Sequence, residues 1–151
     1  MEEIMADTLP LEAASALDNA PAHWPDAIRE DFIRNQLNPC VGTELLSENE
    51  RVRVWRVQVA PGERLPFHRH VLDYFWCAIT SGQARSHLQD GRIVDIPVTA
   101  GQVVHSRYGA GEYKLHDLVN TGTTELIFTT VEFLDSTNAA LPVPATALRR
   151  S

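Results

Sequence analysis

This sequence of 151 residues has only two cysteines and no long hydrophobic run, and these two features exclude several classes of protein. Cys40 and Cys77 are far apart and show no CxxC spacing, so we expect free thiols rather than a disulfide framework or a thiolate metal site. No stretch approaches the roughly 20 apolar residues of a membrane helix. The acidic start MEEIMADT has neither the basic nor the apolar region of a secretory signal. We therefore expect a cytoplasmic protein without a membrane partner.

Positive charge is also scarce, because 13 basic residues oppose 20 acidic ones and leave a net charge of −7. Residues 1–50 hold 11 acids and 2 bases, whereas the remainder holds 9 acids and 11 bases. This balance offers no basic stripe for a phosphate backbone, so we expect no nucleic-acid partner. Local arginines could still bind an anionic small molecule.

Glycines mark the central part of the chain, since all eight lie between Gly42 and Gly122 and separate short β-rich runs. The run RVRVWRVQV, residues 51–59, ends in the turn Ala60-Pro61-Gly62. Short strands at this spacing predict an all-β sandwich or barrel in one compact domain. Further strands are predicted at 83–88, 93–98, 102–107, 113–120 and 125–133.

The chain before this window has a helical pattern. In DAIREDFIRNQL, Ile28, Phe32 and Ile33 recur at helical spacing and predict one short amphipathic helix. Residues 1–20 are predicted to be an arm or disordered, and the tail from Ser136 to drape over the surface or fray. The predicted organisation is an N-terminal arm and helix (1–40), a barrel (41–135) and a C-terminal tail (136–151).

His68 and His70 stand two apart in PFHRHVLDYFW, a β-like segment. Side chains at this spacing share one face, with α-carbons about 6.6 Å apart. One divalent ion can close that span, because a histidine nitrogen binds at about 2.1 Å. Alone, such a pair is more often two exposed histidines on a sheet edge. His116 lies in another strand-like run, 46 residues after His70, and the three together predict a metal site.

These residues resemble the cupin family over Val41–Leu134. The resemblance implies a double-stranded β-helix (jelly-roll) barrel, a divalent metal ion held by His68, His70 and His116, and a homodimer formed by sheet packing or strand exchange. The first motif is matched by Gly62, His68, His70 and Gly82, and the second by Gly111, His116 and Asn120.

The glutamate of the first motif is missing, because Tyr74 and Phe75 stand in its place. An HRHxxDY pattern is similar to that of a subgroup of small cupins. The resemblance then implies three neutral imidazoles with open positions for water or substrate, and Asp73 as the nearest acid. The phenol of Tyr74 is predicted to face inward, where it either donates a hydrogen bond to bound water or substrate or packs in the core.

Four further positions are candidates near the metal. His105 and Arg107 share a face by alternation, and if they point inward Arg107 could clamp a substrate carboxylate. Otherwise they face solvent or a subunit interface, and Tyr108 follows them. Asn120 either orients a metal-bound water or holds the strand end. The two histidines without matching partners are expected at the surface (His23 and His87).

The segment Phe75–Ile79 is apolar on both alternating faces, which a strand with one face in water does not need. Its outer face should therefore be covered, either by the N-terminal helix or by a second protomer.

The first functional hypothesis is a metal-dependent enzyme acting on a small organic acid, most simply an oxygenase with iron. Manganese, nickel or zinc would instead serve isomerase, lyase or hydrolytic chemistry. The alternatives are a non-catalytic cupin that binds a small, anionic ligand, and a metal-free epimerase-like cupin with His70 or His116 as base and Tyr74 as acid. A fold alone does not choose among them.

Overall fold

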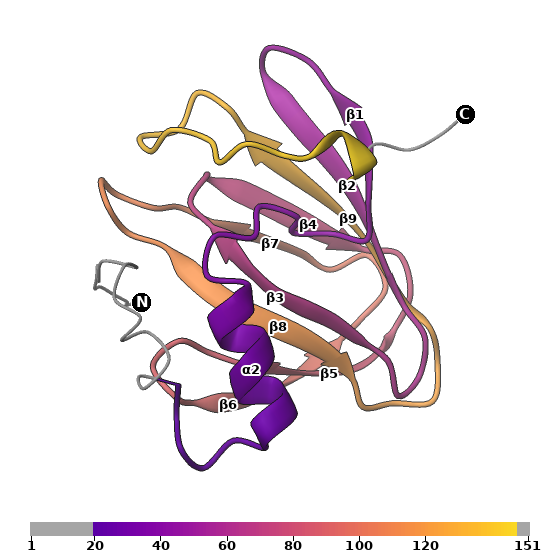
Figure 1. Ribbon diagram of the computed structural model, residues 1–151. Coiled ribbons are helices and arrows are strands. Elements are labelled where there is room, and N and C mark those ends of the chain that lie inside the picture. The colour runs from indigo at the N-terminus through magenta and orange to yellow at the C-terminus, as the bar shows by residue number, and fades with distance from the viewer. Residues whose placement is uncertain (1–19, 148–151) are drawn as a thin grey trace.

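The computed structural model describes residues 20–147 and shows two antiparallel sheets facing each other, with one helix outside (Figure 1). The first, sheet A, has the strand order β1-β2-β9-β4-β7, and the second, sheet B, has the order β3-β8-β5-β6. The all-β prediction with one short helix is confirmed. The strands are β1 (Glu44–Glu48), β2 (Val52–Val59), β3 (Arg64–His70), β4 (Tyr74–Ala78), β5 (Gly82–His87), β6 (Ile93–Val98), β7 (Val103–Ser106), β8 (Lys114–Asn120) and β9 (Leu126–Phe133).

The six runs predicted as strands correspond to β2 and to β5 through β9, with ends that differ by at most one residue. Two details differ from the sequence patterns. The segment 66–76 holds parts of two strands, because β3 ends at His70 and β4 begins at Tyr74. Strand β1 was not predicted, since ELLSE is short, polar and poor in β-branched residues.

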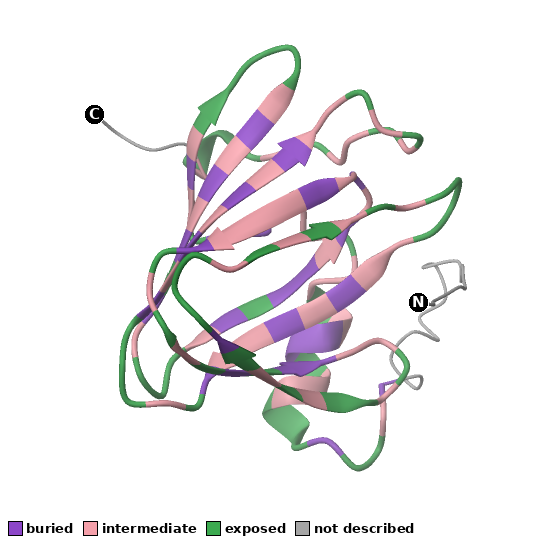
Figure 2. Cartoon of the chain, turned by 180° about the vertical axis from the view of Figure 1, so that it is seen from behind, coloured by how far each residue is buried: buried purple, intermediate pink, exposed green. Residues whose placement is uncertain are grey.

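The barrel interior is apolar at one end. Burial alternates along β2 and β9 (Figure 2), and this alternation places every second side chain on the inward face. At the turn into β3, Gly62 adopts a φ of +83°, which a residue with a Cβ rarely adopts. At the opposite end of the barrel the inward positions are polar or aromatic. The apolar end is formed by Val57, Val59, Leu65, Ala78, Ala84, Val98, Leu126 and Phe128.

Helix α2 (Asp26–Arg34) covers the outer face of sheet B. Phe32 packs edge-on against Phe67 of β3, with ring centroids 5.1 Å apart, and Trp24 stacks on Phe67 at 5.6 Å. Leu115 of β8 completes this contact. No helix within residues 20–147 is long and apolar enough to span a membrane.

The alternative in which the helix covers the outer face of Phe75–Ile79 is wrong, because that strand belongs to sheet A and α2 lies on sheet B. On the outer face of sheet A, Ile79 is 54% and Val103 48% exposed. A second protomer on this face stays a prediction.

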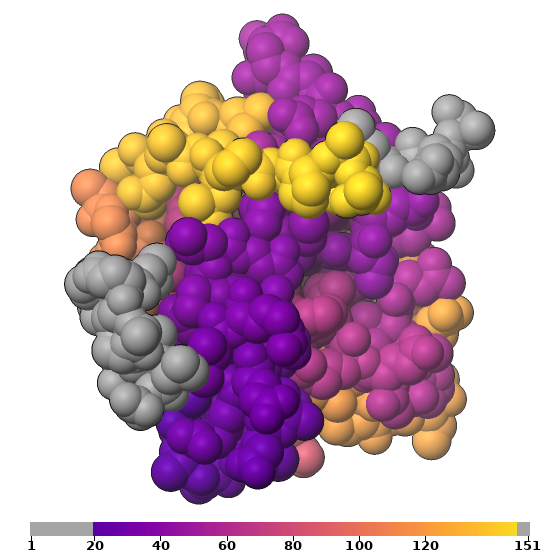
Figure 3. Space-filling model, in the orientation of Figure 1, coloured from indigo at the N-terminus to yellow at the C-terminus, as the bar shows by residue number. Residues whose placement is uncertain are grey.

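The C-terminal segment lies against the barrel above α2 (Figure 3). Val143 and Ala147, the latter in the short helix η1 (Ala145–Ala147), pack on Val41, Leu45 and Trp55. The predicted N-terminal arm falls almost entirely on residues 1–19, which lie outside the described residues, as do residues 148–151.

A buried charge network ties α2 to sheet B. The carboxylate of Asp117, fully buried on β8, accepts hydrogen bonds from Arg64 Nε at 2.9 Å and from the backbone N–H of His87 at 2.7 Å. Arg64 also donates to Asp31 of α2 at 3.0 Å. The expectation that His87 lies at the surface is therefore wrong, because its ring is buried and hydrogen-bonds to Asp117. His23 is exposed as expected.

Replacing Asp117 with Ala should lower the free energy of unfolding by about 3 kcal/mol, because it leaves the partners of a buried carboxylate unpaired. Urea unfolding followed by tryptophan fluorescence measures this loss. The matched control is Asp95→Ala, which removes the exposed ion pair between Asp95 and Arg85 on neighbouring strands and should change little. Equal effects of the two substitutions would contradict the network's role.

Candidate metal site

A bulge in β3 sets the direction of the first histidine. Leu65 pairs with Leu118 of β8 and His68 pairs with His116, so three steps along β3 match two along β8. As a result Leu65 and His68 both face the barrel interior, while Phe67 between them faces α2.

Three backbone groups of the bulge have hydrogen-bond partners. The N–H of Phe67 donates to the Asp31 carboxylate at 2.9 Å, and the carbonyl of Phe67 accepts from the Asn38 side chain at 2.9 Å. The carbonyl of Pro66 lies 2.8 Å from Nδ1 of His68. Because a carbonyl only accepts, Nδ1 carries the hydrogen and Nε2 keeps its lone pair for a metal ion.

The three predicted ligands meet in space. His68 and His70 project from β3 and His116 from β8, and their ligand nitrogens lie within 4.8 Å of one another. The Nε2 atoms of His70 and His116 are only 3.2 Å apart. Two nitrogens bound to one ion at about 2.1 Å lie at most about 4.2 Å apart, so the nitrogens of His70 and His116 already fit one ion. Small side-chain shifts bring the remaining nitrogen–nitrogen distances within the same limit.

Burial keeps all three imidazoles neutral. Loss of solvation lowers the pKa of His68 to about 4. Loss of solvation also lowers the pKa values of His70 and His116 well below 6.5, and repulsion from Lys114 and the neighbouring histidines adds to this effect. Neutral imidazoles are the form that binds a divalent metal ion, so the donor set fits such an ion.

Tyr74, which replaces the missing glutamate, lies beside the histidines. Its buried ring stacks on His70, with centroids 4.2 Å apart and planes 11° from parallel. Burial raises the pKa of Tyr108, and a hydrogen bond with the Tyr74 side chain raises it further. Asp73 accepts a hydrogen bond from the backbone N–H of Tyr108 at 2.9 Å, so its carboxylate positions Tyr108.

The structure does not bring the remaining candidates to the histidines. Asn120 donates to the carbonyls of Val59 and Thr124, which makes it a tie between strand ends. His105 pairs with Phe75 on the outer face of sheet A and is exposed, as is Arg107.

A row of polar side chains on sheet A faces the histidines across the barrel. Cross-strand pairing brings one residue from each strand to the same level: Ser106, Tyr74, Glu132, Arg53 and Glu48. We call this set the polar row. Only the two edge members are more than slightly exposed, so the row lines the interior.

Glu132 supplies a carboxylate inside the barrel. Trp55 Nε1 donates to it at 2.8 Å, and burial raises its pKa to about 7 against the lowering effects of Trp55 and Arg53. The sequence reasoning missed Glu132 and Arg53. Alternation was the available signal, because Glu132 shares a face with Phe128, and Arg53 shares one with Trp55.

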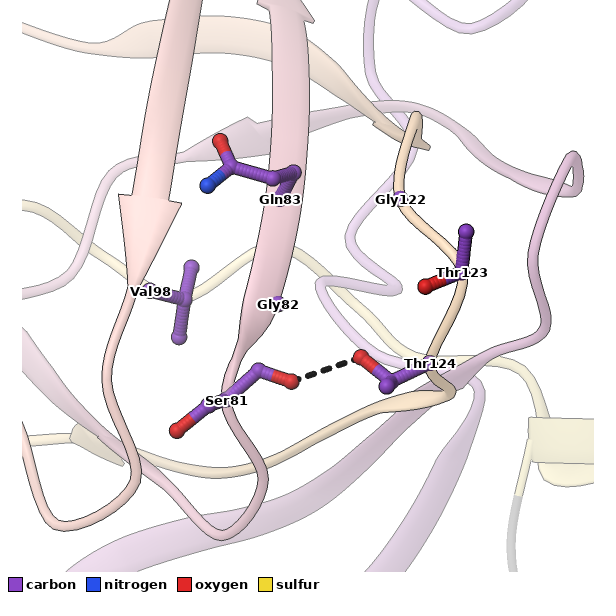
Figure 4. A pocket seen from close by; sticks show the side chains of 7 residues that line it. All are labelled: Ser81, Gly82, Gln83, Val98, Gly122, Thr123 and Thr124. Atoms are coloured by element: carbon purple, nitrogen blue, oxygen red, sulfur yellow. Dashed lines mark hydrogen bonds between the residues drawn. The ribbon is translucent and has the colours of Figure 1, made fainter.

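A shallow hollow of about 500 Å³ lies at the other end of the barrel (Figure 4). The hydroxyl of Thr124 there donates to the carbonyl of Ser81 at 2.7 Å. Its lining has no titratable group, so we assign no chemistry to it. The lining residues are Ser81, Gly82, Gln83, Val98, Gly122, Thr123 and Thr124.

Solved structures that share this architecture include the following two. A cupin domain from Bordetella pertussis Tohama I is 29% identical with a TM-score of 0.51, over 58% of this chain and 85% of that one. A conserved protein with a double-stranded β-helix domain from Klebsiella pneumoniae subsp. pneumoniae is 22% identical with a TM-score of 0.50, over 68% of this chain and 86% of that one. No family model and no curated protein matches the sequence. The fold is the cupin double-stranded β-helix.

The buried histidines should make the metal-free protein less stable in acid. The pKa of His68 is about 4 in the folded protein and about 6.5 in the unfolded chain, so only the unfolded chain takes up this proton between pH 6.5 and 4. The free energy of unfolding therefore decreases as the pH is lowered through this range. Replacing His68 with Gln should therefore reduce the slope of unfolding free energy against pH by about 1.4 kcal/mol per unit in that window.

Urea unfolding at a series of pH values measures this slope. Glu132 has the opposite effect, because its raised pKa lowers the free energy of unfolding as pH rises from about 4.5 to 7. The informative quantity is therefore the difference in slope between His68→Gln and wild type, not the slope of either protein alone. An unchanged slope in His68→Gln would contradict a neutral, buried His68.

Proposed function

We propose that this chain is a metal-dependent cupin enzyme that acts on a small organic acid. The observation that carries the proposal is the convergence of three neutral imidazoles, those of His68, His70 and His116, inside the polar end of the barrel. Three neutral ligands leave the charge of a divalent ion uncompensated, which favours an anionic substrate.

The bound ion would supply Lewis-acid chemistry, or with iron the activation of dioxygen, and an oxygenase with iron is the reaction class we favour. Manganese, nickel and zinc suit the same ligands. The chain's own residues would do the rest. His68 is held in one tautomer by the carbonyl of Pro66, and Tyr74 offers a phenol beside His70 that can donate a hydrogen bond to the substrate. Burial of His68 and His70 excludes water from the reacting groups.

A metal-free acid–base enzyme is the second candidate, and the stacking of Tyr74 on His70 is the observation that favours it. A neutral imidazole is a competent base, and a phenol beside it is a competent acid. Metal content separates the two candidates.

Protein purified without an affinity tag should contain about one divalent ion per chain, and His68→Ala and His116→Ala should each lose it. Each substitution removes one of three ligands, and no other cluster of this kind was found among residues 20–147. Elemental mass spectrometry gives metal per chain. The control is His105→Ala, an exposed histidine on the outer face of sheet A, which should keep the ion. Metal-free wild type, even after reconstitution, would refute the metal enzyme.

Replacing Tyr74 with Phe should leave metal content unchanged and yet impair the reaction by roughly 100-fold or more, because it keeps the stacked ring and removes the hydroxyl that donates the proton and that hydrogen-bonds with Tyr108. Metal content is measured first, and turnover once a substrate is found. A Tyr74→Phe protein without metal would show that the three histidines do not suffice.

A further inference from the structure

Arg53 is a buried cation that the three-histidine site does not use. It lies in β2 with 8% of its side chain exposed and points into the barrel with its neighbours in the polar row. Its Nε forms an ion pair with Glu48 Oε1 at 3.5 Å but makes no hydrogen bond to any of the described residues. A buried guanidinium nitrogen without a hydrogen-bond acceptor is costly, so this side chain is suited to receive a further anion.

The position of Arg53 relates it to the metal ligands. Tyr74 stacks on His70, Glu132 pairs across strands with Tyr74, and Arg53 pairs across strands with Glu132. Adjacent strands are about 4.8 Å apart, so Arg53 stands about 10 Å from Tyr74 along the sheet. This distance is between backbone positions, and the long side chain of Arg53 covers part of it. A molecule of a few carbons can therefore span the rest.

We propose that Arg53 binds a carboxylate of the substrate, at a subsite in the polar row, while the other end of the same molecule faces the three histidines. The second half of this statement rests on the proposed function, and the carboxylate subsite stands without it. The substrate class is then a small acid with a second, metal-binding group several carbons from its carboxylate. Arg107, the arginine predicted for this task, is exposed, and the structure does not bring it to the histidines.

Glu132 would make this subsite sensitive to pH. Burial raises the pKa of Glu132 to about 7, so below that pH the carboxyl is neutral and leaves Arg53 to the substrate, whereas above it the ionised group competes for the same cation. Affinity for the second carboxylate should therefore weaken as pH rises through 7. The titratable or polar groups near Glu132 are Arg53 and Trp55 of β2, Glu48 of β1, Tyr74 of β4, Tyr108 after β7 and Cys40 before β1.

The test compares two probes of the same chain length, succinate with two carboxylates and butyrate with one, by titration into the protein as purified, after its metal content is known. Wild type should bind succinate about 10- to 100-fold more tightly, the usual range for one charge-assisted pair. In Arg53→Gln this preference should fall to less than twofold, and Arg53→Lys should restore part of it.

Arg56→Gln is the matched control. Arg56 lies on the same strand, faces the other way and is near Glu44 at 3.7 Å, as Arg53 is near Glu48 at 3.5 Å. This variant should keep the wild-type preference, and Glu132→Gln should keep it at pH 8 as well as at pH 6. Circular dichroism and thermal unfolding confirm that each variant is folded.

The outcomes separate the two proposals. Protein that contains no metal even after reconstitution but prefers succinate, with the preference lost in Arg53→Gln, supports the subsite while refuting the metal enzyme. Protein that contains metal but shows no preference, or the same preference in Arg53→Gln as in wild type, overturns the role of Arg53 and leaves the three-histidine site intact.

Discussion

The bulge at Pro66 and Phe67 is the constraint on which both faces of sheet B depend. It turns Phe67 outward into the contact with α2 and His68 inward to the metal ligands. Helix α2 in turn stabilises the strand, because the Asp31 carboxylate accepts a hydrogen bond from the Phe67 N–H, which the bulge leaves without a partner on β8. Helix packing, the tautomer of His68 and the direction of its free nitrogen are therefore parts of one local arrangement.

Charge in this barrel is divided between its two sheets. Sheet B contributes neutral imidazoles to the interior, with Lys114 on the same face of β8 as His116, and places Asp117 and Arg64 on the outer face beneath α2. Sheet A contributes Arg53 and Glu132 to the interior, in the polar row. A metal ion on one sheet and an arginine on the other would bind the two ends of an acid, with Tyr74 between them. The apolar opposite end supplies the packing that holds the sheets together.

Much of this could be predicted from the sequence, because strand periodicity and turn glycines act locally. The strands β2 and β5 through β9 and the meeting of His68, His70 and His116 follow from alternation and motif spacing. What the sequence did not reveal depends on long-range pairing. His87 looks like an ordinary surface residue until Trp24, which precedes α2, packs on its ring and Asp117 pairs with it. Glu132 becomes a neighbour of Tyr74 only through the pairing of β4 with β9. Alternation puts His105 and Arg107 on one face of their strand, and the pairing of β7 with β4 decides that this face points outward.

X-ray absorption at the edge of the metal in the purified protein tests the central claim most directly, because it counts the ligands around the ion. The account predicts three imidazole nitrogens at about 2.0 to 2.1 Å, together with oxygen ligands from water and no sulfur. One imidazole or none, or a sulfur at about 2.3 Å, would contradict the assignment of His68, His70 and His116 as the metal ligands.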